Sequence, residues 1–181
     1  MNMIIKKILN NNVVITTNYQ MEEIIVMGKG LAYGKQAGDN IDMNKINKTF
    51  EVSLKPSQRK MINMLKDIPL EYMEISDCVI KEAKVDLEVD DSLYISLTDH
   101  IHTSIERYKE GVYLKNHMLF EIKNFYPKEF ELGLLTLKLI KEKYGINMEE
   151  DEAAFLALHI VSSEVGRNIS DIYEMTNFIL E

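Results

Sequence analysis

The sequence predicts a multi-domain α and β protein, in which a small antiparallel β-sheet is followed by an all-α bundle of five helices. The apolar pattern changes near residues 55–57 from short β-branched runs to helical spacing. The net charge changes at the same place, because residues 1–55 carry seven Lys and five acidic residues (+2), whereas the remainder carries 14 Lys or Arg and 24 acidic residues (−10). We therefore expect domains at residues 1–55 and 56–167, and a connecting segment over residues 168–181.

Short strands separated by polar turns account for the first domain. Residues 13–17 are β-branched throughout, which favours a strand, and the polar turn at 18–21 indicates a hairpin. The apolar run at 24–27 predicts a strand that is buried on both faces. Because so small a sheet cannot cover both of its faces alone, we expect two copies to pair face to face as a homodimer. The further strands are expected at residues 4–9 and 22–27, with a short strand or helical turn near 50–52.

Helical spacing of apolar residues begins after residue 57, where Ser57 is a candidate N-cap. Pro127 suits a first helical turn and Gly145 suits the position just after a helix. Asn147 and Glu150 have the spacing of a capping box before a final helix that is apolar almost all round, which predicts that this helix is the central, buried one. The expected helices cover residues 57–68, 72–83, 91–110, 127–144 and 153–165.

Composition and missing motifs exclude several classes of protein. With 46% hydrophobic residues and only three prolines, the chain can fill a core. The single cysteine, Cys78, excludes an internal disulfide and fits a reducing cytoplasm, and no apolar run reaches the length of a membrane span. Zinc-binding His or Cys spacings, G-x-S-x-G, the P-loop and G-x-G-x-x-G are all absent. We therefore expect a cytoplasmic protein that is not an enzyme and has no metal or cofactor.

One stretch, residues 28–35, combines three glycines, two lysines and a tyrosine directly after an apolar strand. Glycine permits a close backbone approach, lysine can meet a phosphate, and a tyrosine ring offers a face on which an unpaired base can stack. The same residues would also form an ordinary glycine-rich turn whose lysines keep a sheet edge soluble. Taken alone, they favour this plainer interpretation slightly.

Two of the four histidines have notable surroundings. His159 lies in the most apolar helix, where an imidazole needs a hydrogen-bond partner. His100 follows Asp99, and a carboxylate beside an imidazole fixes its tautomer and leaves the other nitrogen free to act as a base or nucleophile. The residues alone favour two hydrogen-bonded core histidines that stabilise helix packing.

Five motifs, in order along nearly the whole chain, resemble the BglG/LicT/SacY family of transcriptional antiterminators, in particular members that control β-glucoside operons. Residues 6–13 and 26–33 resemble the N-terminal RNA-binding (co-antiterminator) domain of that family. Residues 97–102, 125–130 and 151–159 resemble its first phosphotransferase-system regulation domain.

This resemblance implies that a small sheet, active as a dimer, binds a hairpin in nascent leader mRNA and so prevents a terminator from forming. Some relatives have arginine where this chain has Lys29, and lysine lacks the bidentate guanidinium contact. Many have phenylalanine where this chain has Tyr33, which keeps the stacking face. The implied RNA contacts are Lys7, Asn12, Gly28, Lys29, Gly30 and Tyr33.

In the helical domain the resemblance makes His100 and His159 phosphate acceptors, with Asp99 as a supporting residue. The phosphate would come from phosphotransferase-system proteins, a sugar-specific enzyme II and HPr, and would disfavour the dimer while inducer sugar is absent. Full-length members have a second regulation domain, so we expect this chain to be a two-domain fragment. The alternative is a histidine phosphotransfer module or phosphocarrier without RNA binding, which would not need the loop at residues 28–35.

Overall fold

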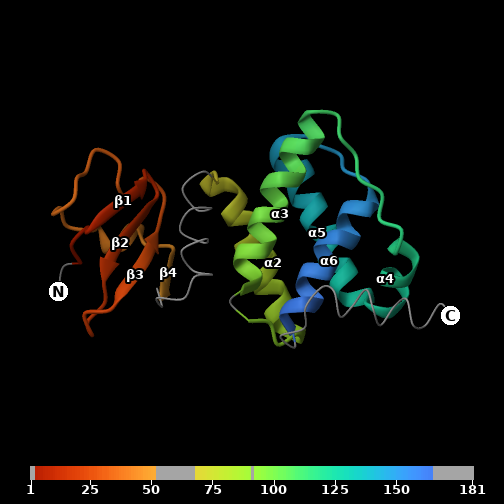
Figure 1. The fold of residues 1–181 in the computed structure, drawn as a ribbon, viewed down its shortest axis with the longest axis horizontal. Helices are drawn as coiled ribbons and strands as arrows, with labels where there is room; N and C mark the ends of the chain where they lie inside the picture. Colours follow the sequence, from red (N-terminus) through yellow and green to blue (C-terminus); the bar gives the residue numbers. More distant parts are fainter. Residues whose placement is uncertain (1–2, 52–67, 91, 165–181) are drawn as a thin grey trace. The chain divides into compact units, whose positions relative to one another are not determined.

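The computed structural model describes residues 3–51, 68–90 and 92–164 (Figure 1). The chain divides into two compact units, Met1–Leu70 and Glu71–Glu181. The first unit contains a four-stranded antiparallel sheet and the second contains helices, so the predicted fold class is confirmed.

Parts of the predicted organisation lie outside the described residues. These parts are the boundary between residues 55 and 56, the connecting segment 168–181, and nearly all of the expected helix 57–68.

The sheet has the strand order β1-β2-β3-β4, and every neighbouring pair is antiparallel. In the central hairpin Val14 pairs with Val26 and Ile15 pairs with Ile25. The expected strands all form, although the first begins three residues later than predicted and the last is clearly a strand. The strand bounds are β1 Lys7–Asn10, β2 Val13–Thr17, β3 Glu23–Met27 and β4 Lys48–Glu51.

Both faces of β3 are buried, as the run of four apolar residues predicts. One face of the hairpin, with Val14 and Val26, packs against Leu31 and its neighbours. On the other face, Ile25 and Met27 of β3 are 1% exposed, whereas Ile15 of β2 is half-buried and Glu23 at the start of β3 is exposed. The burial of β3 is thus as predicted, and the face-to-face homodimer stays a prediction.

Five helices follow in the described residues (Figure 1). Pro127 occupies the first turn of α5, and Gly145 ends that helix with a left-handed φ of 69°, both as predicted. The short helix α4 was not predicted, and α6 begins at Glu150, so Asn147 does not cap it. None of these helices is long and apolar enough to span a membrane. The helix bounds are α2 Leu70–Asp86, α3 Ser92–Lys109, α4 Leu119–Phe125, α5 Pro127–Tyr144 and α6 Glu150–Glu164.

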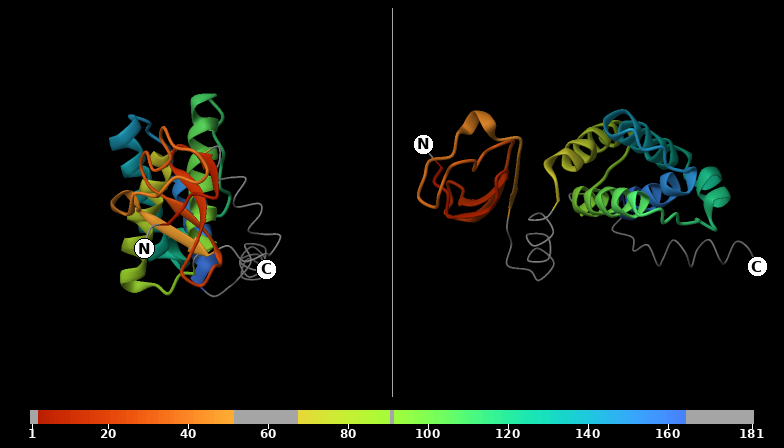
Figure 2. Two further views of the ribbon diagram at one scale, coloured as in Figure 1. Left: turned by 90° about the vertical axis from the view of Figure 1, so that its left-hand side faces the viewer. Right: turned by 90° about the horizontal axis from the view of Figure 1, so that it is seen from above.

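Helix α6 is the central helix of its unit, as its apolar composition predicts. It contacts α3, α4 and α5, and Figures 1 and 2 show it beside α3 and α5. The backbones of α5 and α6 approach closely at Gly133, where a Cβ atom would lie 2.3 Å from the carbonyl oxygen of Ala153. Small residues at this crossing therefore set the position of α6 and of the side chains that it carries.

Candidate functional site

The loop that follows β3 is fixed to the turn between β1 and β2 by hydrogen bonds. The backbone N–H of Gly30 donates to the side-chain Oδ1 of Asn12 at 2.8 Å, and that of Gly28 donates to the Asn12 carbonyl at 2.9 Å. The N–H of Ala32 donates to the carbonyl of Asn11 at 2.9 Å. Asn12 therefore determines the shape of the loop, a role that the sequence did not indicate.

Two of the three glycines of this loop, Gly28 and Gly30, determine its backbone course. A Cβ atom on Gly28 would lie 1.7 Å from the carbonyl oxygen of Lys45, so only glycine fits there. Gly28 is buried under that contact, and its expected place at the RNA stays a prediction. Gly30 has a φ of +62°, a conformation that L residues rarely adopt.

Between these backbone contacts the loop presents exposed polar groups. Leu31 and Ala32 are buried and anchor the loop, whereas Lys29 is exposed and the Tyr33 side chain is 76% exposed. The Oδ1 atom of Asn12 is engaged, and the structure describes no partner for its side-chain NH₂ group. The loop thus carries a flat ring and a cation, and the adjoining turn between β1 and β2 carries an amide donor.

Lys7 is the one predicted RNA-binding residue outside this group. It is exposed at the start of β1, whereas the other five lie at or near the turn that follows the end of that strand. The structure therefore brings together five of the six residues.

In the second unit, His100 on α3 and His159 on α6 are in contact. The Nε2 atom of His159 lies 3.3 Å from Nδ1 of His100, and the ring centroids are 5.0 Å apart. The sequence indicated both residues but not their pairing, because the packing of α3 against α6 joins positions 59 residues apart.

A buried carboxylate holds the other side of the His100 ring. The Oε2 atom of Glu152 lies 3.0 Å from His100 Nε2, and Arg107 Nη2 donates to Glu152 Oε1 at 2.9 Å. The structure describes no contact between the Asp99 side chain and this ring, so Glu152 is the carboxylate that holds it, and a supporting role of Asp99 stays a prediction. The sequence held one signal of this, since Glu152 precedes His159 by seven residues, about two helical turns along one face.

Charge and burial define the protonation of this centre. Burial, with His100 nearby, lowers the pKa of His159 to about 4, so this ring is neutral at pH 7. Burial raises the pKa of Glu152, but the hydrogen bonds from His100 and Arg107 outweigh that effect, and its net pKa is lowered. An ionised carboxylate only accepts, so His100 Nε2 carries a proton. In neutral His100, Nδ1 then accepts from His159 Nε2–H.

The centre, defined as Arg107, Glu152, His100 and His159, is suited to nucleophilic chemistry at an imidazole. A neutral ring whose one nitrogen is held by a carboxylate has a lone pair on the other nitrogen. Across the described ranges, no group of three or more His, Cys, Asp or Glu could hold a metal ion.

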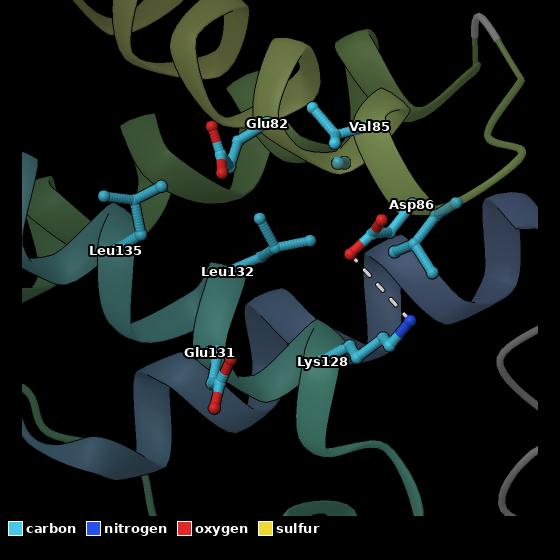
Figure 3. Close-up of a pocket in the computed structure, with 9 residues that line it drawn as sticks. Glu82, Val85, Asp86, Lys128, Glu131, Leu132 and Leu135 are labelled. Atoms are coloured by element: carbon cyan, nitrogen blue, oxygen red, sulfur yellow. Dashed lines mark ion pairs between the residues drawn. The ribbon is translucent and has the colours of Figure 1, made fainter.

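A separate hollow of about 240 Å³ lies between α2 and α5 (Figure 3). Leu132 and Leu135 form its apolar wall and Glu82 lies at its rim, while Lys128 pairs with Asp86 at 3.9 Å. It contains no histidine or cysteine, so it lacks the nucleophile that the histidine centre offers.

Comparison with protein families assigns both parts of the chain. Residues 3–59 match the model of the CAT RNA binding domain, and residues 73–163 match that of the PRD domain. The loop of the first unit falls in the first match, and the histidine centre falls in the second.

Known proteins match over nearly the whole chain. The transcription antiterminator LicT of Bacillus subtilis (strain 168) is 42% identical over 179 residues, which cover 98% of this chain and 65% of LicT. The β-glucoside operon antiterminator of Dickeya chrysanthemi is 39% identical, over 98% of this chain and 63% of that protein. The chain thus spans somewhat less than two thirds of each relative. The crystal structure of GlcT CAT-PRDI superposes with a TM-score of 0.74 at 32% identity, covering 91% of this chain and 99% of that one.

Proposed function

Since the chain belongs to the PRD-domain family of transcription antiterminators and carries a CAT RNA-binding domain, we propose that it binds a hairpin in operon leader RNA and prevents a transcription terminator from forming. The observation that carries this proposal is the loop on which Lys29 and Tyr33 are exposed while Asn12 fixes the backbone beneath them. The protein acts as a regulator, not as an enzyme. The name of the Dickeya relative supports a β-glucoside operon as its target.

RNA is read by this loop through three kinds of contact. The exposed Tyr33 ring stacks on an unpaired base, and Lys29 and Lys7 contact the phosphate backbone. The side-chain NH₂ group of Asn12 donates to a base edge while its oxygen holds the loop. Gly28 and Gly30 act indirectly, by giving the loop its shape.

The protein works in the cytoplasm as a homodimer. Two copies of the loop, one from each protomer, then form one RNA site of the size of a hairpin. Support for the dimer comes from the family resemblance and from the face of the sheet on which Ile15 is only half-buried.

Phosphorylation regulates this activity at His100 and His159. The donors are proteins of the sugar phosphotransferase system, an enzyme II and HPr, as the PRD match supports. A phosphoryl group adds negative charge at the contact between His100 and His159 and disrupts the packing of α3 on α6. Replacing both histidines by alanine should make antitermination insensitive to the transported sugar, whereas an unchanged sugar response in that double variant would contradict this regulation.

RNA binding is tested by gel shift with a bulged hairpin from a sugar-operon leader. We expect Tyr33→Ala to weaken binding by about 1–3 kcal/mol, roughly five- to 150-fold, because a stacked base is lost. Tyr19→Ala is the matched control, since Tyr19 is 72% exposed but lies in the turn at the opposite end of β3. Equal effects of the two changes would contradict a specific role for the loop.

The alternative, a phosphotransfer module, is favoured only by the histidine centre. It predicts that the wild-type protein accepts and passes on phosphate but binds no leader hairpin. Absence of binding by the wild-type dimer, at low salt where phosphate contacts are strongest, would favour this alternative.

A further inference from the structure

The geometry points to Glu152 as a positioning residue that, anchored by Arg107, directs phosphorylation of His100 to its Nδ1 atom. This inference rests on the proposed histidine phosphorylation and concerns its chemistry. An imidazole attacks phosphorus with the nitrogen that has a free lone pair. Which nitrogen that is depends on the partner that holds the ring's proton.

Both ring nitrogens of His100 are engaged, but unequally. Nε2 donates to a carboxylate that is only 6% exposed and is itself held by Arg107. Nδ1 faces the neutral ring of His159 over a longer distance, 3.3 Å against 3.0 Å. A hydrogen bond to a buried charge is stronger than one between two neutral rings, so the contact with His159 is the easier one to open.

Electrostatics also favours Nδ1 of His100 as the phosphorylated nitrogen. A phosphoryl group on Nε2 would place its negative charge against the Glu152 carboxylate in a poorly hydrated site. On Nδ1 it would replace the His159 contact, and the carboxylate would remain on the opposite side of the ring. Glu152 would then neutralise the positive charge that the ring acquires.

The transfer balances without a proton leaving His100. The donor is a phosphohistidine that is protonated on its second ring nitrogen. The Nδ1 lone pair of His100 forms the new N–P bond as the donor's P–N bond breaks, and the donor leaves with the bonding pair as a neutral imidazole. The Nε2 proton of His100 stays on the ring, hydrogen-bonded to Glu152.

Substitution of Glu152 by glutamine should reverse the tautomer. Arg107 only donates, so the amide oxygen of the new side chain would face Arg107 and its NH₂ group would face His100 Nε2. Nε2 would then be the acceptor and Nδ1 would carry the proton. The lone pair on Nδ1 would be lost, although the shape of the side chain is nearly unchanged.

The test uses the full 181-residue chain and phosphoramidate, a small phosphoryl donor that needs no partner protein. Nitrogen NMR of the histidine rings reports the tautomer, and proton–phosphorus correlation reports which nitrogen carries phosphate. In the wild type we expect an Nε2–H tautomer and phosphate on Nδ1 of His100. In Glu152→Gln we expect the tautomer to reverse and phosphorylation to slow by about tenfold, the low end of the effect of removing the hydrogen-bond partner of a metal-ligating histidine.

Glu150→Gln is the matched control, because it makes the same charge change in the first turn of α6 while Glu150, among the residues that the structure describes, pairs with exposed Lys123 and not with a histidine. This control should leave unchanged the tautomer of His100, the nitrogen that carries the phosphate and the rate of phosphorylation. Phosphate on Nε2 of wild-type His100 would overturn the inference, and so would an unchanged tautomer in Glu152→Gln. The wild-type measurements decide the question even if that variant does not fold.

The outcome is separable from the proposed function. Phosphate on Nδ1 from phosphoramidate, with no transfer from phosphotransferase-system proteins, would support the inference and contradict the regulation. Phosphate transfer from those proteins to Nε2 of His100 would support the regulation and contradict the inference.

Discussion

The loop after β3 exposes its functional side chains, whereas the histidines on α3 and α6 are largely enclosed. Tyr33 is 76% exposed and Lys29 is exposed, and each would contact RNA by itself. In the second unit, successive hydrogen bonds run from Arg107 to Glu152, from Glu152 to His100 and from His100 to His159. A change in one of these side chains therefore alters the others.

This difference teaches where the specificity of each site comes from. The loop is rigid because its backbone is fixed, by the Asn12 side chain and by the contact of Gly28 with Lys45. The histidine centre is defined by side chains from two helices, so its state depends on helix packing and on protonation. We expect the loop to be sensitive to steric change and the centre to be sensitive to charge.

The largest effect should come from adding a methyl group at Gly28. In Gly28→Ala the new Cβ would overlap the Lys45 carbonyl, so we expect a loss of about 3 kcal/mol in the stability of the first unit and of RNA binding with it. Amide hydrogen exchange, read separately for the two units, measures this. Gly133→Ala, which would overlap Ala153 in the second unit, is the matched control. If Gly28→Ala destabilised the second unit instead, the contact of Gly28 with Lys45 would not be what stabilises the first unit.

Acid should act on the second unit through His159. Its pKa is about 4 in the folded chain against 6.5 for an ordinary histidine, so the unfolded state binds the proton more readily. The resulting stability is present above pH 6.5 and is lost as the pH falls toward 4, by up to about 3 kcal/mol. Glu152, whose pKa is lowered, adds to the loss below the ordinary range of a glutamate.

NMR-monitored thermal unfolding at pH 7 and pH 5 measures this difference unit by unit. The first unit has no histidine and should change little over this range. Replacing His159 by asparagine should flatten the pH dependence of the second unit, whereas replacing exposed His117 in the same way should not. A second unit that is equally stable at both pH values would contradict the buried, neutral state of His159.

The smallest effect concerns additivity. Lys29→Ala and Tyr33→Ala should weaken RNA binding independently, so that their free energies add within about 0.5 kcal/mol. Arg107→Ala and Glu152→Ala should couple by about 1 kcal/mol in stability, because the two side chains share one hydrogen bond. Double-mutant cycles measure both values. A coupling energy of much more than about 0.5 kcal/mol between Lys29 and Tyr33 would contradict the view that each contacts RNA by itself.

The functional residues differ in how far the sequence predicted them. Lys29 and Tyr33 were indicated by residue type next to glycines, and they are exposed as an RNA-contacting role requires. Gly28 was identified for its freedom of backbone approach, but the atom that approaches is the Lys45 carbonyl of the same chain. Asp99 was chosen because it is next to His100 in sequence, whereas side chains that are adjacent in a helix point to different sides.

By itself the sequence determined the class of the two units, most of the strands, the central place of α6 and the identity of the two histidines. The units, the strands and the place of α6 follow from local propensity and apolar periodicity, which act over a few residues, whereas the role of the two histidines is what the family resemblance implies. The tertiary structure decided that Asn12 holds the loop and that Glu152 and His159 flank His100. Such contacts join distant positions through the packing of whole elements, so no local pattern specifies them.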